Sequence, residues 1–213
     1  MRRRRLLQTV GTGLLAGCLG GGEETAEQFG VSGGPLERGG TLPARFTCYG
    51  DGVSPAFDVD RVPAPTEALA VVGSYDSGGL TDPVFWTLWN VPPDTDRIPA
   101  NLPRTATVAS LGGARQGRPE GGDVGYEPPC PQVSQRYTVR FQVYALGARL
   151  DIEGGTDHDT ASEAIGDAVL ASRRFTADFE RTPTASSGVQ SASSGRPPTA
   201  VGPSSSMWRE PDA

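Results

Sequence analysis

The segment ALAVVGSYDSGGLTDPVFWTLWNVP, residues 68–92, contains two apolar runs joined by a polar, glycine-rich loop. Both runs are rich in β-branched and aromatic residues, are too short for helices, and are bounded by Gly, Pro or Asn, which is typical of buried strands. Asp76 lies where the first run ends. A carboxylate beside an aromatic strand can form half of a small-molecule pocket if other loops reach it. The alternative is that Asp76 only caps the loop as an Asx-turn residue.

The composition predicts one mostly β domain. The chain has 213 residues, of which 29 are Gly and 19 are Pro. This length suits one domain of ordinary size, and frequent turn formers favour short strands over long helices.

The chain is acidic, and its basic residues are all of one kind. The net charge is −6, with 25 acidic and 19 basic side chains, and every basic one is Arg. Outside the N-terminal run Arg2–Arg5, 15 basic residues remain against 25 acidic ones, a net charge near −10. Acidity without Lys is typical of proteins in very high salt, as in halophilic archaea, and a GC-rich coding bias is an equal alternative. Nucleic acid is not an expected partner, because phosphate binding needs clustered Arg or Lys.

Residues 1–17, MRRRRLLQTVGTGLLAG, have the pattern of an export signal. A basic start precedes an apolar stretch far shorter than the roughly 20 residues that span a bilayer. Arg4-Arg5-Leu6-Leu7-Gln8 resembles a twin-arginine export motif, and Leu15-Ala16-Gly17-Cys18 resembles a lipobox. We therefore expect a lipid on Cys18, a flexible tether over residues 18–28, and a location on the outer face of the cell membrane. The alternative is a plain cleaved signal with an incidental cysteine.

The remaining patterns predict further strands, one helix and a tail. Strands are expected at residues 29–46 (one or two edge strands), 57–59, 67–72, 84–89, 136–146 and 174–179. Residues 94–123 lack apolar periodicity and predict a long loop. Residues 182–213 are rich in Ser, Thr, Gly and Pro, and they predict a disordered tail.

Two of these elements have a defined periodicity. In residues 136–146 apolar and polar side chains alternate, which predicts a half-buried strand. Its buried face would carry Tyr137, Val139, Phe141, Val143 and Ala145. A helix is expected over about residues 160–170, with Thr160 and Glu163 at the spacing of a capping box.

Several short motifs, in one order, resemble the phosphatidylethanolamine-binding proteins, in the bacterial and archaeal branch described as Raf kinase inhibitor-like. The motifs are Thr47-Cys48-x-Gly50 before Ser54-Pro55, Tyr75-Asp76, Val84-x-Trp86 running to Asn90-Val91-Pro92, Gln116-Gly117 before Gly125-Tyr126, Pro129-Cys130-Pro131, and Arg136-Tyr137. The resemblance covers about residues 29–181. It implies a Greek-key β-sandwich with a few short helices and a small pocket at one end.

In that family the pocket is an anion-sized hole formed by an Asp, two His and a Pro-Cys-Pro loop. The resemblance implies that a ligand is held by Asp76, Phe85, Trp86, Gly125, Tyr126, Pro129, Cys130, Gln135 and Tyr137. This sequence departs at three places, since Phe85 and Gln135 replace the two His, and Ser77-Gly78 replace Pro-Asp. Without imidazoles to donate to a phosphate, we expect a neutral or amine-bearing ligand rather than a phosphomonoester.

The cysteines and the one histidine suggest structural roles rather than catalytic or metal-binding ones. With Cys18 assigned to lipid, Cys48 and Cys130 form an even pair in an exported chain, which predicts a disulfide between two loops at the pocket rim. The alternative is a free nucleophile, but the sequence places no cation or imidazole beside either thiol. His158 alone cannot form a zinc site, and the sequence contains no Gly-x-Ser-x-Gly nucleophile elbow. We therefore expect no metal, cofactor or catalysis.

The sequence therefore predicts an exported, lipid-anchored module that binds a small ligand or the side chain of a protein partner. A second hypothesis is a surface protein that inhibits or regulates a peptidase or another enzyme through its pocket loops. A hydrolase that uses Asp76 or Cys130 is the third hypothesis.

Overall fold

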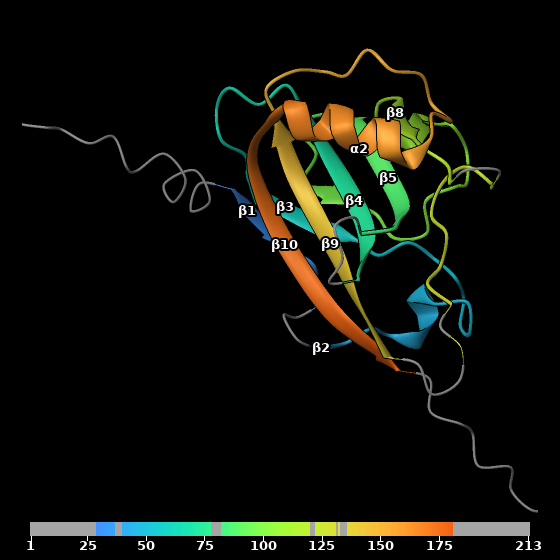
Figure 1. Cartoon of the computed structure of the whole chain (residues 1–213). Coiled ribbons are helices and arrows are strands. Elements are labelled where there is room, and N and C mark those ends of the chain that lie inside the picture. Colours follow the sequence, from blue (N-terminus) through green and yellow to red (C-terminus); the bar gives the residue numbers. More distant parts are fainter. Residues whose placement is uncertain are drawn as a thin grey trace, which may run out of the picture. The chain divides into compact units, whose positions relative to one another are not determined.

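Two β-sheets pack face to face in the computed structural model (Figure 1). The structure describes residues 29–36, 40–77, 82–119, 122–130, 132 and 136–180. The expectations for Cys18, the tether, Gln135 and the tail lie outside these residues.

The larger sheet has seven strands and the smaller sheet has three, within the described residues. In spatial order the larger sheet contains β2 (Gly40–Thr41), β10 (Val169–Glu180), β9 (Arg136–Leu146), β4 (Ala68–Asp76), β5 (Val84–Val91), β8 (Ala114–Gln116) and β7 (Thr107–Val108). The smaller sheet contains β1 (Gly30–Ser32), β3 (Phe57–Arg61) and β6 (Arg97–Ile98). Among the described residues, the helices are the 3-10 turns η1 (Ala44–Phe46) and η2 (Ala109–Leu111) and the α-helix α2 (His158–Asp167).

The two apolar runs of the opening segment form neighbouring central strands. β4 pairs antiparallel with β5 on one side and with β9 on the other. The alternation expected in β9 is confirmed, since Val139, Phe141, Val143 and Ala145 are buried and Tyr137 is half-buried. The predicted mostly β fold is therefore correct.

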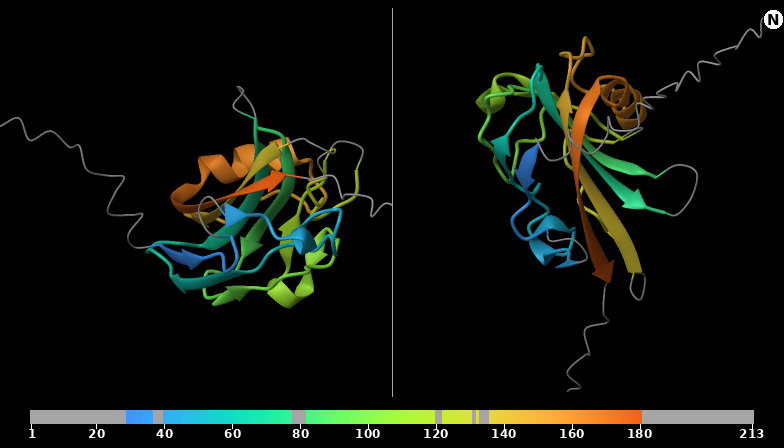
Figure 2. Two further views of the ribbon diagram at one scale, coloured as in Figure 1. Left: turned by 90° about the horizontal axis from the view of Figure 1, so that it is seen from below. Right: turned by 90° about the vertical axis from the view of Figure 1, so that its left-hand side faces the viewer.

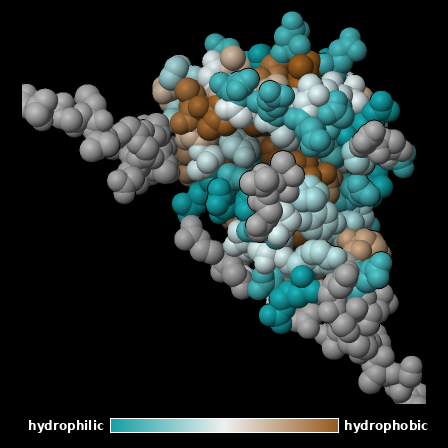
Figure 3. All heavy atoms as spheres, viewed as in Figure 1, coloured by the Kyte–Doolittle hydropathy of each residue, from teal (hydrophilic) through white to brown (hydrophobic). Residues whose placement is uncertain are grey.

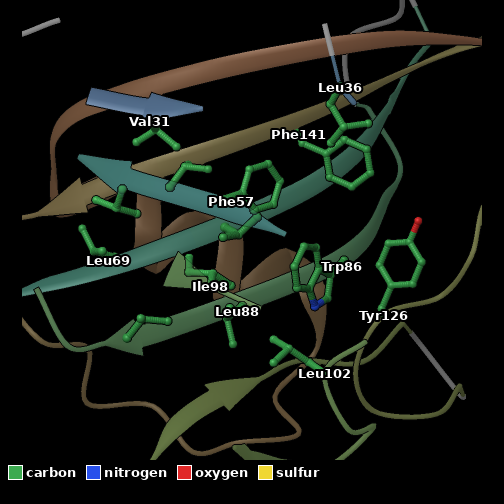
Figure 4. Close-up of a cluster of buried hydrophobic side chains, with 14 of the residues drawn as sticks. Val31, Leu36, Phe57, Leu69, Trp86, Leu88, Ile98, Leu102, Tyr126 and Phe141 are labelled. Carbon is green, nitrogen blue, oxygen red and sulfur yellow. The ribbon is translucent and has the colours of Figure 1, made fainter. Parts of the chain in front are cut away.

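The main core lies between the two sheets (Figure 4). Its largest fully buried side chains include Trp86 from β5, Phe57 from β3 and Phe141 from β9. A second cluster, around Trp89, lies between the larger sheet and α2. Figure 2 shows α2 and the smaller sheet on opposite sides of the larger sheet. Because β5 is buried on both faces, its run of apolar residues does not alternate with polar ones.

The helix begins and ends earlier than predicted. Asp157 is the N-cap, and its carboxylate accepts a hydrogen bond from the Thr160 backbone N–H at 2.8 Å. The predicted capping box with Thr160 as the N-cap is therefore wrong, because Asp157 is the N-cap and already accepts the hydrogen bond of the Thr160 N–H. The apolar pattern continues into Val169, but this residue pairs with Leu146 as the start of β10, so tertiary pairing overrides the helical period.

The predicted long loop over residues 94–123 is wrong in part. It contains β6, β7, η2 and β8, each of two or three residues. Strands this short are held by backbone hydrogen bonds to neighbouring strands and show too few side chains for a periodicity to appear in the sequence.

The surface over α2 and the long strands is mostly hydrophilic, with hydrophobic residues in small separate groups (Figure 3). At one edge, and as far as the described residues show, β2 pairs with β10 in parallel at Ala177 and Asp178. Among the described residues, no helix is long and apolar enough to span a membrane.

Candidate functional site

A cavity of about 670 Å³ lies where β4 ends and β9 begins. It is lined by Tyr75, Asp76, Ser77, Pro83, Cys130, Arg136, Tyr137 and Thr138. Three of the predicted ligand-binding residues, Asp76, Cys130 and Tyr137, are thus brought together. The other lining residues were not in the predicted set, although the family motifs included Tyr75 and Arg136.

Strand alternation separates the polar and aromatic walls of the cavity. Tyr75 packs toward the main core, and Asp76, the next residue, points to the opposite face of the sheet, where it meets Arg140. The Tyr75 and Tyr137 rings meet edge to face, with centroids 5.8 Å apart. Burial raises the pKa of Tyr75, and a hydrogen bond from the backbone of Cys130 acts in the opposite direction. Tyr75 is therefore neutral and joins the Cys130 loop to the strand.

The Asp76 carboxylate belongs to a charged cluster beside the cavity. Arg140 donates to Asp76 at 2.9 Å and to Asp82 at 2.6 Å. Asp82 also accepts from the N–H and the hydroxyl of Ser77, and these bonds together with Arg140 lower its pKa. The Asp76 side chain remains 39% exposed. Two carboxylates therefore share one guanidinium, and one of them still faces solvent.

Arg140 was missed in the sequence. The alternation of β9 predicts that Arg140 lies on the solvent-facing side of the strand. Its contact with Asp76, however, depends on the register of β4 against β9, which pairs Asp76 with Thr138. Burial works to lower the pKa of Arg140, but hydrogen bonds to both carboxylates outweigh burial and raise it.

The three aromatic side chains of the predicted set that do not line the cavity are Phe85, Trp86 and Tyr126. Phe85 is 2% exposed, and its ring contacts those of Tyr75, Tyr126 and Phe141 at centroid distances of 5.1, 5.9 and 5.6 Å. Trp86 is fully buried against Tyr126. The hydroxyl of Tyr126 donates to the Phe46 carbonyl at 2.7 Å, and burial raises its pKa. These rings form the layer beneath the cavity, so Phe85 occupies core volume rather than facing a ligand.

The loop of residues 125–130 brings Cys130 to the cavity wall, and several bonds hold the loop in place. Gly125 has φ 102°, which favours glycine, and its N–H donates to the Gly117 carbonyl. The Pro129 carbonyl accepts from the N–H of Cys48 at 3.2 Å. Cys48 and Cys130 form the expected disulfide, with Cα atoms 5.2 Å apart. Gly125 and Pro129 therefore position the wall without lining the cavity.

Gln116 is a buried polar residue that supports the same region. Its amide oxygen accepts from Trp86 Nε1 at 3.0 Å, and its amide nitrogen donates to the carbonyls of Pro103 and Thr105. The sequence offered one signal, the Gln116-Gly117 motif, but this motif did not indicate a role.

His158 lies apart from this cavity. It is 3% exposed, and its Nδ1 lies 3.0 Å from the Thr87 hydroxyl. Burial lowers its pKa to about 4, although Asp159 and Asp157 act to raise it. Among the described residues, no group of three or more His, Cys, Asp or Glu side chains could hold a metal ion. His158 thus joins α2 to β5 as a neutral side chain at neutral pH.

The structure is thus a two-sheet β-sandwich with a cavity at the strand ends and a cysteine-bearing loop beside it. Residues 32–180 match the phosphatidylethanolamine-binding protein family. The chain belongs to this family.

Relatives and solved structures agree with this assignment. The chain is 30% identical to a UPF0098 protein of Methanothermobacter thermautotrophicus over 142 residues, 67% of this chain and 92% of the relative. It is 31% identical to the UPF0098 protein YbhB of Escherichia coli over 152 residues, 68% of this chain and 95% of the relative. The crystal structure of Escherichia coli YbcL, described as a member of the mammalian PEBP family, matches with a TM-score of 0.65 at 22% identity, covering 72% of this chain and 98% of YbcL. The last similarity supports the fold alone.

Proposed function

We propose that this protein is a binding module that holds a small neutral or amine-bearing organic molecule in the cavity beside Asp76. The observation that carries the proposal is a partly exposed carboxylate on a cavity wall that also contains Tyr75 and Tyr137. Aromatic faces and a carboxylate together attract ammonium groups, and the rings also cover apolar parts of a ligand. Binding rather than catalysis is the role that we propose.

The charges around the cavity disfavour a phosphomonoester. Asp76 and Asp82 carry two negative charges and Glu127 lies close enough to act on Tyr75, whereas Arg140 and Arg136 carry two positive charges, so the site has no excess positive charge to balance a dianion. His158 is the one histidine of the chain and lies elsewhere, so no imidazole can donate to phosphate here. A neutral or zwitterionic molecule fits this balance better.

A thermal-shift screen tests the binding proposal. We expect a small amine or amino acid at about 100 times its Kd to raise the Tm by about 5 to 10 °C, and a phosphomonoester to have less effect. Asp76→Asn should reduce the shift to about half or less, because a charge-assisted hydrogen bond is worth about tenfold in affinity. Asp58→Asn is the matched control, since Asp58 pairs with Arg97 and its side chain is 43% exposed. An equal loss in both variants, or stabilisation by phosphomonoesters alone, contradicts the proposal.

We also propose that the module is exported and anchored to the outer face of the cell membrane through a lipid on Cys18. The support is the order of the arginine run, the apolar stretch and the lipobox-like Leu15-Ala16-Gly17-Cys18. Cys18→Ser should shift the protein from the membrane fraction to the medium, or leave it as the unprocessed precursor. Membrane fractionation and the mass of the mature N-terminus would decide this. An unchanged fraction and an unchanged N-terminus would show that Cys18 carries no anchor.

A further inference from the structure

The cavity wall contains a disulfide that solvent can reach. Both Cys48 and Cys130 are exposed. Cys130 lines the cavity, whereas Cys48 does not. A small molecule inside the cavity would therefore approach the bond from the Cys130 side.

The same cavity offers a carboxylate and a guanidinium. Asp76 and Arg136 both line it, together with the rings of Tyr75 and Tyr137. A carboxylate recognises an ammonium group, and a guanidinium recognises a carboxylate. A small molecule that carries both groups would be held in the cavity that Cys130 also lines.

We propose that the Cys48–Cys130 bond is a thiol-exchange site and that its substrate is a small thiol bearing an ammonium and a carboxylate group. The thiolate of the bound molecule attacks Sγ of Cys130 and forms a mixed disulfide there. The Cys48–Cys130 bond breaks, its electron pair goes to Sγ of Cys48, and the resulting thiolate takes a proton from water. The protein disulfide is the oxidant, so the step needs no further reagent, and attack by Cys48 on the mixed disulfide reverses it.

The loop can survive this reaction because other bonds hold it. Cys48 N–H donates to Pro129, the Tyr126 hydroxyl donates to Phe46, and the Glu127 N–H donates to the Phe85 carbonyl at 3.0 Å. These bonds keep Cys48 near Cys130 after the disulfide opens, which favours reclosure. The disulfide can thus report occupancy of the cavity without unfolding its wall.

The test compares four thiols on the purified, oxidised protein. L-Cysteine carries both charged groups, cysteamine lacks the carboxylate, 3-mercaptopropionate lacks the ammonium, and 2-mercaptoethanol lacks both. After an acid quench, mass spectrometry of the intact protein and of its peptides gives the rate and the position of the adduct, with Cys18 on a separate peptide. We expect L-cysteine to modify Cys130 at least about tenfold faster per thiolate than 2-mercaptoethanol, with the other two thiols between them.

Matched variants show whether the cavity causes this preference. Asp76→Asn should reduce the advantage of L-cysteine over 3-mercaptopropionate, and Asp58→Asn should leave it unchanged. Equal rates for the four thiols, a main adduct on Cys48, or an equal effect of Asp58→Asn would overturn the inference. The inference rests on the proposed function because it uses the same cavity. The experiments nevertheless distinguish failure of the exchange reaction from failure of ligand binding. Stabilisation by an amine without sulfur, together with unselective exchange, overturns this inference and leaves the binding proposal in place.

Discussion

Trp86→Ala is expected to lower the free energy of unfolding by about 3 to 5 kcal/mol, the range for truncating a large buried aromatic side chain. Trp86 is fully buried between the two sheets and contacts the ring of Tyr126 at a centroid distance of 5.5 Å. The substitution also removes the donor to Gln116, a buried side chain that bonds the chain near Pro103 and Thr105. Urea unfolding of parent and variant, followed by circular dichroism, measures the loss.

A pair of smaller substitutions separates packing from hydrogen bonding. Trp86→Phe removes the Nε1 donor to Gln116. Trp89 is equally buried on the same strand, but its Nε1 has no hydrogen-bond partner among the described residues. We therefore expect Trp86→Phe to cost about 1 to 3 kcal/mol more than Trp89→Phe, because it leaves a buried acceptor unpaired. Equal costs for the two substitutions would show that the Gln116 bond contributes nothing measurable.

Acid is expected to destabilise the fold through His158. Its pKa is about 4 in the folded protein, against an ordinary value of 6.5. Below pH 6.5 the unfolded chain binds a proton that the folded protein does not, so stability is complete above this pH and falls as the pH drops toward 4. The expected loss is about 2 kcal/mol between pH 7.5 and pH 5, and about 3 kcal/mol by pH 4. Chemical unfolding at a series of pH values measures it.

His158→Gln is the control for this effect. The amide of the new glutamine can still form a hydrogen bond with the Thr87 hydroxyl, but it does not titrate. Because His158 is the only histidine, the decrease between pH 7.5 and pH 5 should largely disappear in the variant. Asp82 and Asp157, whose pKa values are lowered, contribute losses only in more acidic solution. A variant with the same slope as the parent would show that His158 is not the group that titrates.

Much of the fold could be predicted because its central strands carry strong local patterns. β4 and β5 are largely continuous apolar runs, and apolar and polar residues alternate in β9. The burial of these strands can therefore be predicted from residues that are close together in sequence. The two-residue and three-residue strands between positions 97 and 116 could not be predicted. β6 and β8 pair with strands that are distant in sequence, and all three strands are too short to show a side-chain periodicity. The start of β10 was missed because Val169 follows a helical pattern and its strand partner, Leu146, lies on another element.

The candidate site was predictable at Asp76, Cys130 and Tyr137, where motifs lie next to strand ends. It was not predictable at Arg140, since the contact with Asp76 depends on strand register. The family motifs also suggested that Phe85 faces a ligand, whereas its ring packs beneath Tyr75 in the core. A motif identifies which position corresponds to a family residue, but it does not show toward which side a replaced side chain turns.

The short pairing of β2 with β10 bears on how this protein avoids self-association through its strands. Within the described residues, β2 covers β10 only at Ala177 and Asp178, and no other described strand pairs with the outer side of β10. Open edges can add strands from other molecules and start aggregates. Arg173 and Arg174 lie on β10 before Ala177 and are exposed. A second copy that docked there would bring its own arginines close to these, and the repulsion between like charges would oppose aggregation.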